Sequence, residues 1–305
     1  MAPIKTPWTR LIRFVAVETG RVHIGQPVDS DLDVGLAYAQ KSTIKAYEIL
    51  GSTLSPGDAH VSSEVLTIHT LLSPLDSSEI PIIRALGLNY SDHAAEAKMA
   101  IPDFPILFYK PLKSLLGPGA AIIIPRAAQP PKEHLPDYEV ELVIVVGKAA
   151  KDVKEEEALD YVLGYTGAND ISFRKHQLAV SQWGFSKSFD NTNPLGPVLV
   201  SNSLIPNPQT VPLKCTLNGS TVQDGTTADM IFGVRHTIAF LSQGTTLEPG
   251  TIILTGTPKG VGFVKQPPLY LKDGDKVAVW VGGGIGTLVN EIKEEGKGKL
   301  TRAKL

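Results

Sequence analysis

Hydrophobic residues along this chain occur mostly in short runs that alternate with polar residues, which is the pattern of β-strands. The strongest run covers residues 138–147, where Val140, Leu142 and Ile144 alternate with other side chains. Weaker runs of the same kind predict ten further strands. They cover residues 14–17, 21–24, 82–86, 106–109, 121–124, 164–168, 197–200, 213–217, 251–255 and 276–281.

Helical spacing of apolar residues is less frequent. It predicts helices at residues 42–50, 62–71, 155–163 and 234–243, and a further helix that begins near Asp92. Residues 72–78 are rich in turn formers, so we place a boundary there between a small N-terminal domain (1–79) and a larger domain (80–305). Many strands with few helices predict a mainly β fold with flanking helices (α+β) rather than a doubly wound sheet.

Composition narrows the classes of partner. The 305 residues are 42% hydrophobic and 20% charged, as in ordinary globular proteins, and the formal net charge is −2. Without a basic excess we expect no nucleic-acid partner, and without an apolar run of roughly 18 residues we expect no membrane span. The single cysteine, Cys215, excludes an internal disulfide. We therefore expect a cytoplasmic protein, with the mitochondrion as the alternative because Lys5, Arg10 and Arg13 lie near the start.

Acidic residues at the head of the strongest strand are the first candidates for chemistry. Glu139 and Glu141 are two residues apart, so they share one face of the strand, and Asp137 is placed to join them. Carboxylates side by side next to a buried strand repel one another and lose hydration, and a bound cation compensates both effects. The alternative is an edge whose acids face water.

Asp170 follows the apolar residues 165–168, where the chain turns and an acid can project into a cleft; as a common turn residue it can also be purely structural. Together with the two glutamates it would form an all-oxygen site suited to Mg²⁺ or Mn²⁺, with Ca²⁺ as a further possibility. His93 and Glu96 are i, i+3 neighbours if their segment is helical, which suits general-base activation of water but is also common on helix surfaces.

Several polar residues are candidates for binding an anionic substrate. Lys110 follows a predicted strand, Arg174 and Gln177 follow Asp170 closely, and Lys187 lies in a loop flanked by glycine and aromatic residues. Lys and Arg are natural partners of carboxylates, although each of these charges can equally be a solvated surface residue. Thr257 lies in a tight loop after a predicted strand, where hydroxyl and N–H groups can bind a carboxylate.

The order of these motifs resembles the fumarylacetoacetate hydrolase family, from about residue 80 to residue 292. Seven segments carry the resemblance. They are GLNY with His93 and Glu96 (87–96), FYKP (108–111), YEVEL (138–142), GYT through NDIS (164–172), KSFD (187–190), PLGP (194–197) and ILTGTPKGVG (253–262). The resemblance implies a rolled sandwich of mixed β-sheets with a small N-terminal domain, usually assembled as a homodimer.

The resemblance also implies a metal site. It assigns Glu139, Glu141 and Asp170 as the ligands, with Asp137 as a neighbour rather than a ligand. Some residues depart from the family pattern, and these departures put the substrate in doubt. Arg174-Lys175 stands where Arg-Asp is common, residues 191–193 differ, and Asn290-Glu291 replaces a usual Asn-Pro.

Roles for the other candidates follow from the same resemblance. His93 and Glu96 would form a water-activating dyad on a lid that closes over the substrate. Lys187, Gln177 and Thr257 match positions that contact substrate or stabilise developing negative charge.

The predicted function is a metal-dependent hydrolase or lyase that acts on C–C bonds of small 2-oxo acids, by acylpyruvate hydrolysis or oxaloacetate decarboxylation. Within the family, one alternative is oxaloacetate keto–enol tautomerisation, because residues 267–269 and 271–275 resemble the eukaryotic branch of oxaloacetate tautomerases. The other is dienedioate isomerisation. From other classes, the alternatives are an inactive binding protein that kept the fold and a purely structural dimer.

Overall fold

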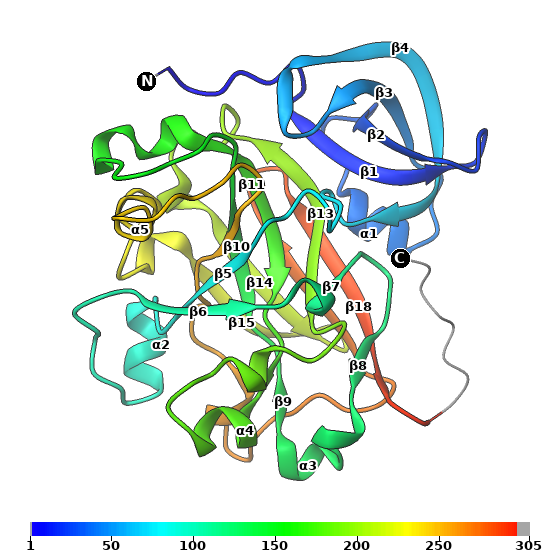
Figure 1. Cartoon of the computed structure of the whole chain (residues 1–305). Coiled ribbons are helices and arrows are strands. Elements are labelled where there is room, and N and C mark those ends of the chain that lie inside the picture. The colour runs from blue at the N-terminus through cyan, green and yellow to red at the C-terminus, as the bar shows by residue number, and fades with distance from the viewer. Residues whose placement is uncertain (1, 298–305) are drawn as a thin grey trace.

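The computed structural model describes residues 2–297, and strands dominate this part of the chain (Figure 1). The long sheet has the strand order β2-β3-β4-β1-β13-β11-β10-β16-β5-β6, with β7 attached to β13. Its strands are β1 (Arg10–Ala16), β2 (Val22–Pro27), β3 (Lys45–Ser52), β4 (Ser55–Leu72), β5 (Ile83–Gly87), β6 (Ile106–Lys110), β7 (Leu115–Leu116), β10 (Val140–Val146), β11 (Val162–Asn169), β13 (Asn193–Ser201) and β16 (Ile252–Leu254).

A second sheet has five strands in the order β15-β14-β17-β18-β8, and β9 and β12 form a separate pair. These strands are β8 (Ile122–Ile124), β9 (Pro136–Asp137), β12 (Ser172–Phe173), β14 (Pro212–Leu217), β15 (Ser220–Thr226), β17 (Lys276–Val281) and β18 (Gly286–Glu294). The pairs β16–β5, β13–β7 and β18–β8 are parallel, while the other pairs in these sheets are antiparallel. The prediction of a mainly β fold with mixed sheets is confirmed.

Helices are short and flank the sheets (Figure 1). They are α1 (Val34–Ala39), α2 (Ser91–Glu96), α3 (Pro131–His134), α4 (Arg174–Ala179) and α5 (Val234–Leu241). Short 3-10 helices join them, among them η3 (Glu155–Tyr161) and η4 (Phe185–Lys187). In the described residues, no helix is long and apolar enough to cross a membrane.

Two predicted helices are wrong. Residues 42–50 and 62–71 belong largely to β3 and β4, which pair with each other in an antiparallel hairpin. The second segment contains the β-branched Val65, Thr67, Ile68 and Thr70, which favour a pleated backbone over a helix. The helix predicted at residues 155–163 is the shorter 3-10 helix η3, and strand β11 begins directly after it.

Strand β10 is buried on both faces and is the centre of the molecule. Val140, Leu142, Ile144 and Val146 belong to one hydrophobic cluster, which also contains residues of β14, β17 and β18. Val143 and Val145 point to the opposite face and belong to a second cluster. Because side chains alternate along a strand, the residues before Val143 at odd positions also point to this second face.

The N-terminal strands β1–β4 continue the long sheet, because β1 pairs with β13 as well as with β2 and β4. Helix α1 packs against β18 through Asp33, which caps the helix at Leu36 and accepts hydrogen bonds from the backbone N–H and hydroxyl of Thr287. Gly35 makes this close approach possible: a Cβ built there would lie 1.8 Å from the Thr287 carbonyl oxygen. The division of the chain after residue 79 stays a prediction.

Replacing Gly35 by Ala should therefore destabilise the protein, because backbone rather than a flexible side chain must move to remove the clash. We expect a loss of about 1–3 kcal/mol, as for other overpacked positions. Gly57→Ala is the matched control, since a Cβ at Gly57 has no neighbour within 4 Å. Thermal unfolding of both variants measures the effect, and equal melting temperatures would contradict the close packing of α1 on β18.

Candidate metal centre and active site

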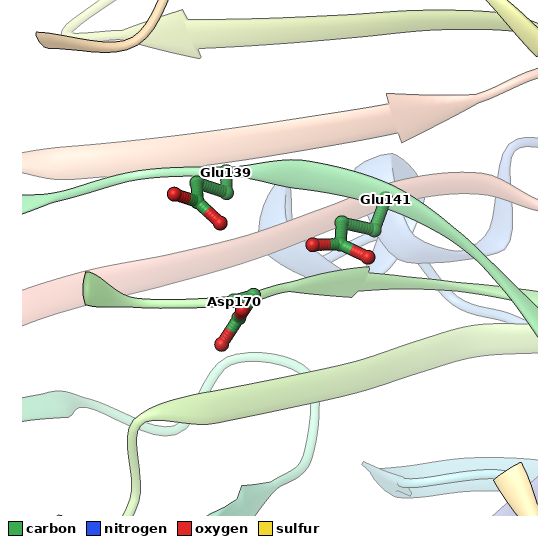
Figure 2. Close-up of side chains that lie close together, drawn as sticks. All are labelled: Glu139, Glu141 and Asp170. Carbon is green, nitrogen blue, oxygen red and sulfur yellow. The ribbon is translucent and has the colours of Figure 1, made fainter. Parts of the chain in front are cut away.

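The pairing of β10 with β11 brings three carboxylates together. Val140 is opposite Asn169 in the register, so Glu139 and Asp170 lie at adjacent ends of the two strands. The Asp170 N–H donates to the Glu139 carbonyl over 2.9 Å, which fixes their separation. Figure 2 shows Glu141 on β10 with Glu139 just before this strand, and Asp170 on the neighbouring segment, just after β11. One carboxylate oxygen from each residue lies within 4.8 Å of the other two.

These acids do not form a solvated edge, which rules out that interpretation of the sequence. Glu139 is 5% exposed, Asp170 1% and Glu141 0%. One oxygen of Glu141, Oε2, accepts a hydrogen bond of 2.6 Å from the Gly256 N–H. The other, Oε1, is buried without a hydrogen-bond partner among the described residues. Burial, and then the charges of Asp170 and Glu139, raise the pKa of Glu141 well above its usual value.

Two lysines neutralise part of this negative charge. The Lys187 ammonium lies 2.8 Å from Glu139 Oε2 and 2.6 Å from Asp170 Oδ2, and the Lys110 ammonium lies 2.5 Å from Asp170 Oδ1. Burial opposes the charged form of Lys187, but Asp170 and Glu139 outweigh it and raise its pKa. For Lys110 burial dominates over Asp170, and its pKa is lowered.

Asp137 is separated from the three carboxylates by its partner Arg174. The Arg174 Nη2 lies 2.8 Å from Asp137, and its Nη1 lies 2.8 Å from Glu139. Asp137 also accepts hydrogen bonds from the backbone N–H groups of Gly262 and Phe263. Asp137 thus ties Arg174 to the loop after β16.

The cations also act on Glu139. Burial by itself would raise the pKa of Glu139, but Lys187 and Arg174 together lower it to about 2.

The donor set fits a hard divalent cation. All three candidate ligands offer carboxylate oxygens, which Mg²⁺ and Mn²⁺ prefer. The buried Glu141 Oε1 is an acceptor that still needs a partner, and such atoms cost free energy when left unpaired. A cation at this position would supply that partner. The sequence-based ligand set Glu139, Glu141 and Asp170 therefore agrees with the geometry of the site.

His93 lies near the carboxylates but is not hydrogen-bonded to Glu96. It is on α2 and is 8% exposed, and its Nδ1 is 3.8 Å from Glu96 Oε2. The same Glu96 oxygen accepts a hydrogen bond of 2.8 Å from the Gly260 N–H. Burial lowers the pKa of His93, although Glu139 opposes this effect, so the neutral imidazole is favoured. The two residues are neighbours, as predicted, but at a separation longer than a hydrogen bond.

A cavity of about 110 Å³ opens beside Glu139 and collects most of the predicted residues. Its lining consists of Leu86, Gly87, Leu88, His93, Ala97, Met99, Phe108, Glu139, Arg174, Gln177, Leu178, Trp183, Lys187, Thr257 and Phe263. Lys110 does not line it, because its buried ammonium lies against Asp170. Lys175, which reverses a charge relative to the family pattern, is exposed.

Sequence reasoning missed the partners that hold the charged groups in place. The amide of Asn169 accepts a hydrogen bond from the Glu139 N–H, and Gln223 Nε2 donates to the Thr257 hydroxyl, which in turn donates to the Val140 carbonyl. It also missed Phe108 and Trp183, whose rings meet edge to face at 5.9 Å in the cavity wall. Phe108 lies in β6 and Trp183 in a loop, and at neither place does the sequence pattern distinguish an aromatic residue of a cavity wall from one of the core.

Comparisons with known proteins agree with this site. Residues 82–293 match the family described as "Fumarylacetoacetate (FAA) hydrolase C-terminal". A caffeoylpyruvate hydrolase from Neonothopanus nambi is 60% identical over 296 residues, which are 97% of this chain and 96% of that protein. The human mitochondrial oxaloacetate tautomerase FAHD2A is 34% identical over 93% of this chain and 91% of its own length.

A solved structure has the same fold. The 2-hydroxyhepta-2,4-diene-1,7-dioate isomerase from Mycobacterium marinum superposes with a TM-score of 0.76 at 31% identity, over 95% of this chain and 100% of that one. The family match covers more than half of the sequence and includes all three carboxylates. This chain is therefore a member of the fumarylacetoacetate hydrolase family.

Proposed function

We propose that the protein is an acylpyruvate hydrolase, which adds water to a 3-acyl 2-oxo acid (a 2,4-dioxo acid) and releases pyruvate and a carboxylate. The observation that carries the proposal is a buried group of three carboxylates, one of which, Glu139, lines a cavity together with the buried His93. The 60% identity to a caffeoylpyruvate hydrolase over nearly the whole chain supports this reaction over others in the family.

The proposal includes a divalent cation, Mg²⁺ or Mn²⁺, held by Glu139, Glu141 and Asp170. When bound, the cation would act as a Lewis acid that polarises the 2-oxo and carboxylate oxygens of the substrate. The buried charges support this assignment. Four acids, Asp137, Glu139, Glu141 and Asp170, face three cations, Lys110, Arg174 and Lys187. A divalent cation would change one excess negative charge into one positive charge, which suits a monoanionic substrate.

His93 is the proposed base. Its neutral imidazole takes a proton from water while the water oxygen adds to the carbonyl carbon of the acyl group. The bond between this carbon and the neighbouring methylene carbon then breaks, and its electron pair stays with the pyruvate part as an enolate. The protonated His93 returns its proton to the former methylene carbon of the enolate, which becomes the methyl group of pyruvate. Glu96 would orient the imidazole, which requires its carboxylate to approach by less than an ångström from 3.8 Å.

Lys187 and Arg174 would offset the negative charge of the enolate. Both line the cavity and are held by buried carboxylates, so their positions are set before the substrate binds. Gln177 and Thr257 add neutral hydrogen-bonding groups to the same lining. Fixed dipoles and charges of this kind stabilise developing charge without having to reorganise during the reaction.

Oxaloacetate tautomerisation is the second candidate, because the human oxaloacetate tautomerase FAHD2A is 34% identical over 93% of this chain. Both reactions pass through an enolate of a 2-oxo acid, so the same charged groups serve either one. They differ in the need for a water-activating base. Oxaloacetate decarboxylation, the other lyase reaction expected from the sequence, also needs no attacking water.

A substrate panel separates these reactions. Incubated with Mg²⁺, the protein should convert acetylpyruvate or benzoylpyruvate to pyruvate and the matching carboxylate, as followed by proton NMR. Oxaloacetate should release CO₂ no faster than it does with Mg²⁺ in the absence of the protein. Accelerated keto–enol exchange of oxaloacetate with no cleavage of any acylpyruvate would replace the proposal by tautomerisation. No turnover with any member of the panel would favour an inactive binding protein.

The metal site can be tested without a substrate. Adding Mg²⁺ or Mn²⁺ to metal-free protein should raise its melting temperature. At a metal concentration of a hundred times the dissociation constant, the free energy of unfolding should increase by about 2.7 kcal/mol. Glu141→Gln should abolish this increase, because it removes a charged ligand with little change in shape. Glu291→Gln is the control, since the Glu291 side chain is 63% exposed. An equal response of wild type and Glu141→Gln would remove Glu141 from the site.

The proposed base predicts a loss in kcat. His93→Gln should lower kcat for an acylpyruvate by about 10²–10⁴-fold, the usual contribution of a general base. The metal-induced rise in melting temperature should persist in this variant, which separates loss of the base from loss of the metal site. Glu96→Gln should have a smaller effect of the same sign. Unchanged kcat in His93→Gln would exclude it as the base.

A further inference from the structure

One wall of the cavity is apolar and rests on an unusual contact between a glycine and a tryptophan. Gly87 is the last residue of β5, and its φ is not positive, so the backbone conformation does not explain why a glycine is found at this position. A Cβ at this position would lie 1.8 Å from Cζ3 and 2.6 Å from Cη2 of Trp183. The edge of the six-membered indole ring at Cζ3 thus occupies the space that a side chain would fill. Its edge-to-face contact with Phe108, at 5.9 Å, fixes it from a second direction.

The depth of the lining residues gives the cavity a direction. Glu139, Lys187 and Thr257 are at most 5% exposed and form its inner end. Leu178 is 69% exposed and Met99 49%, so they form its mouth. The cavity is smaller than the roughly 300–1,000 Å³ that enclose a drug-sized ligand. A substrate whose charged part binds at the inner end therefore extends its other part past Trp183 toward these two apolar side chains.

Among the described residues that line the cavity, none offers a free cation to a second carboxylate at the outer part. The cationic side chains of the described lining, Arg174 and Lys187, are both paired with buried acids. His93 is the remaining ionisable donor, and burial favours its neutral form. A charged acyl group at the mouth would lose hydration against Met99, Leu178 and Trp183 without gaining a partner. An uncharged planar group would instead cover apolar surface and stack on the indole.

We propose that Trp183, seated on Gly87, is the residue that sets the acyl specificity of this cavity, and that it selects an uncharged aromatic acyl group. This inference rests on the proposed acylpyruvate hydrolysis. It makes Trp183 a binding residue for the acyl end of the substrate and Gly87 a positioning residue that acts through the indole.

Kinetics with paired substrates test the role of Trp183. The ratio of kcat/KM for benzoylpyruvate to that for acetylpyruvate should fall about tenfold in Trp183→Ala, the size of a lost aromatic contact. Trp183→Phe should restore most of it. Fumarylpyruvate, which has the same pyruvate end but an acyl group that carries a carboxylate, should be a poorer substrate of the wild type than benzoylpyruvate. Phe104→Ala is the control, because Phe104 is 69% exposed and outside the lining.

A double-mutant cycle tests the role of Gly87. Gly87→Ala should displace the indole and lower the same ratio. In the Trp183→Ala background it should have no further effect, because the clashing ring is gone. Additive effects of the two substitutions would show that Gly87 acts by another route and would overturn its assigned role.

Binding of the reaction products distinguishes failure of this inference from failure of the proposed function. Calorimetry with the Mg²⁺-loaded protein should give tighter binding of benzoate than of acetate, and Trp183→Ala should remove the difference. If no acylpyruvate is cleaved but this difference is found, the specificity of the cavity stands while the reaction does not. If acylpyruvates are cleaved with no preference and no effect of Trp183→Ala, the reaction stands and the inference is wrong.

Discussion

The burial of four carboxylates against three cations at the ends of β10 and β11 is the interaction on which the site depends. An isolated carboxylate inside a protein takes up a proton, but here Lys187 and Arg174 keep the pKa of Glu139 low. Glu141 forms no ion pair with a cation among residues 2–297, and its pKa is raised. The unequal pairing leaves one acid in need of a cation. The surrounding elements hold these charged groups in place: the loop after β16 through Gly256, α4 through Arg174 and η4 through Lys187.

The sequence predicts the strands of the interior better than the N-terminal segments. Residues 142–146 are all apolar because β10 is covered on both faces, and the strand could be predicted from the sequence pattern alone. Residues 42–50 and 62–71 are half-exposed strands, in which polar residues break the alternation and leave a spacing that also fits a helix. Their pairing with each other, which decides the outcome, is not encoded locally.

In the candidate site too, local spacing predicts some features, while others depend on contacts between distant segments. Glu139 and Glu141 could be placed on one face from their spacing, but their distance to Asp170 depends on the register of β10 with β11, and the resemblance to a family supplied that link. Asp137 shows the limit of spacing. It has the same alternation as the two glutamates, yet it lies on the separate strand β9 and pairs with Arg174. Trp183 had no signal, because a loop residue is brought to Gly87 only by the tertiary fold.

The reactive groups and the cavity wall come from different kinds of structure. The carboxylates lie on or beside central strands that are buried on both sides, whereas Trp183, Met99 and Leu178 come from short helices or the segments that follow them. Substitutions in the second group leave the strand pairing intact. The architecture thus places the carboxylates on different elements from those that form the apolar wall of the cavity. A single scaffold of this kind can acquire new substrates by changing a few surface-facing residues while its chemistry stays the same.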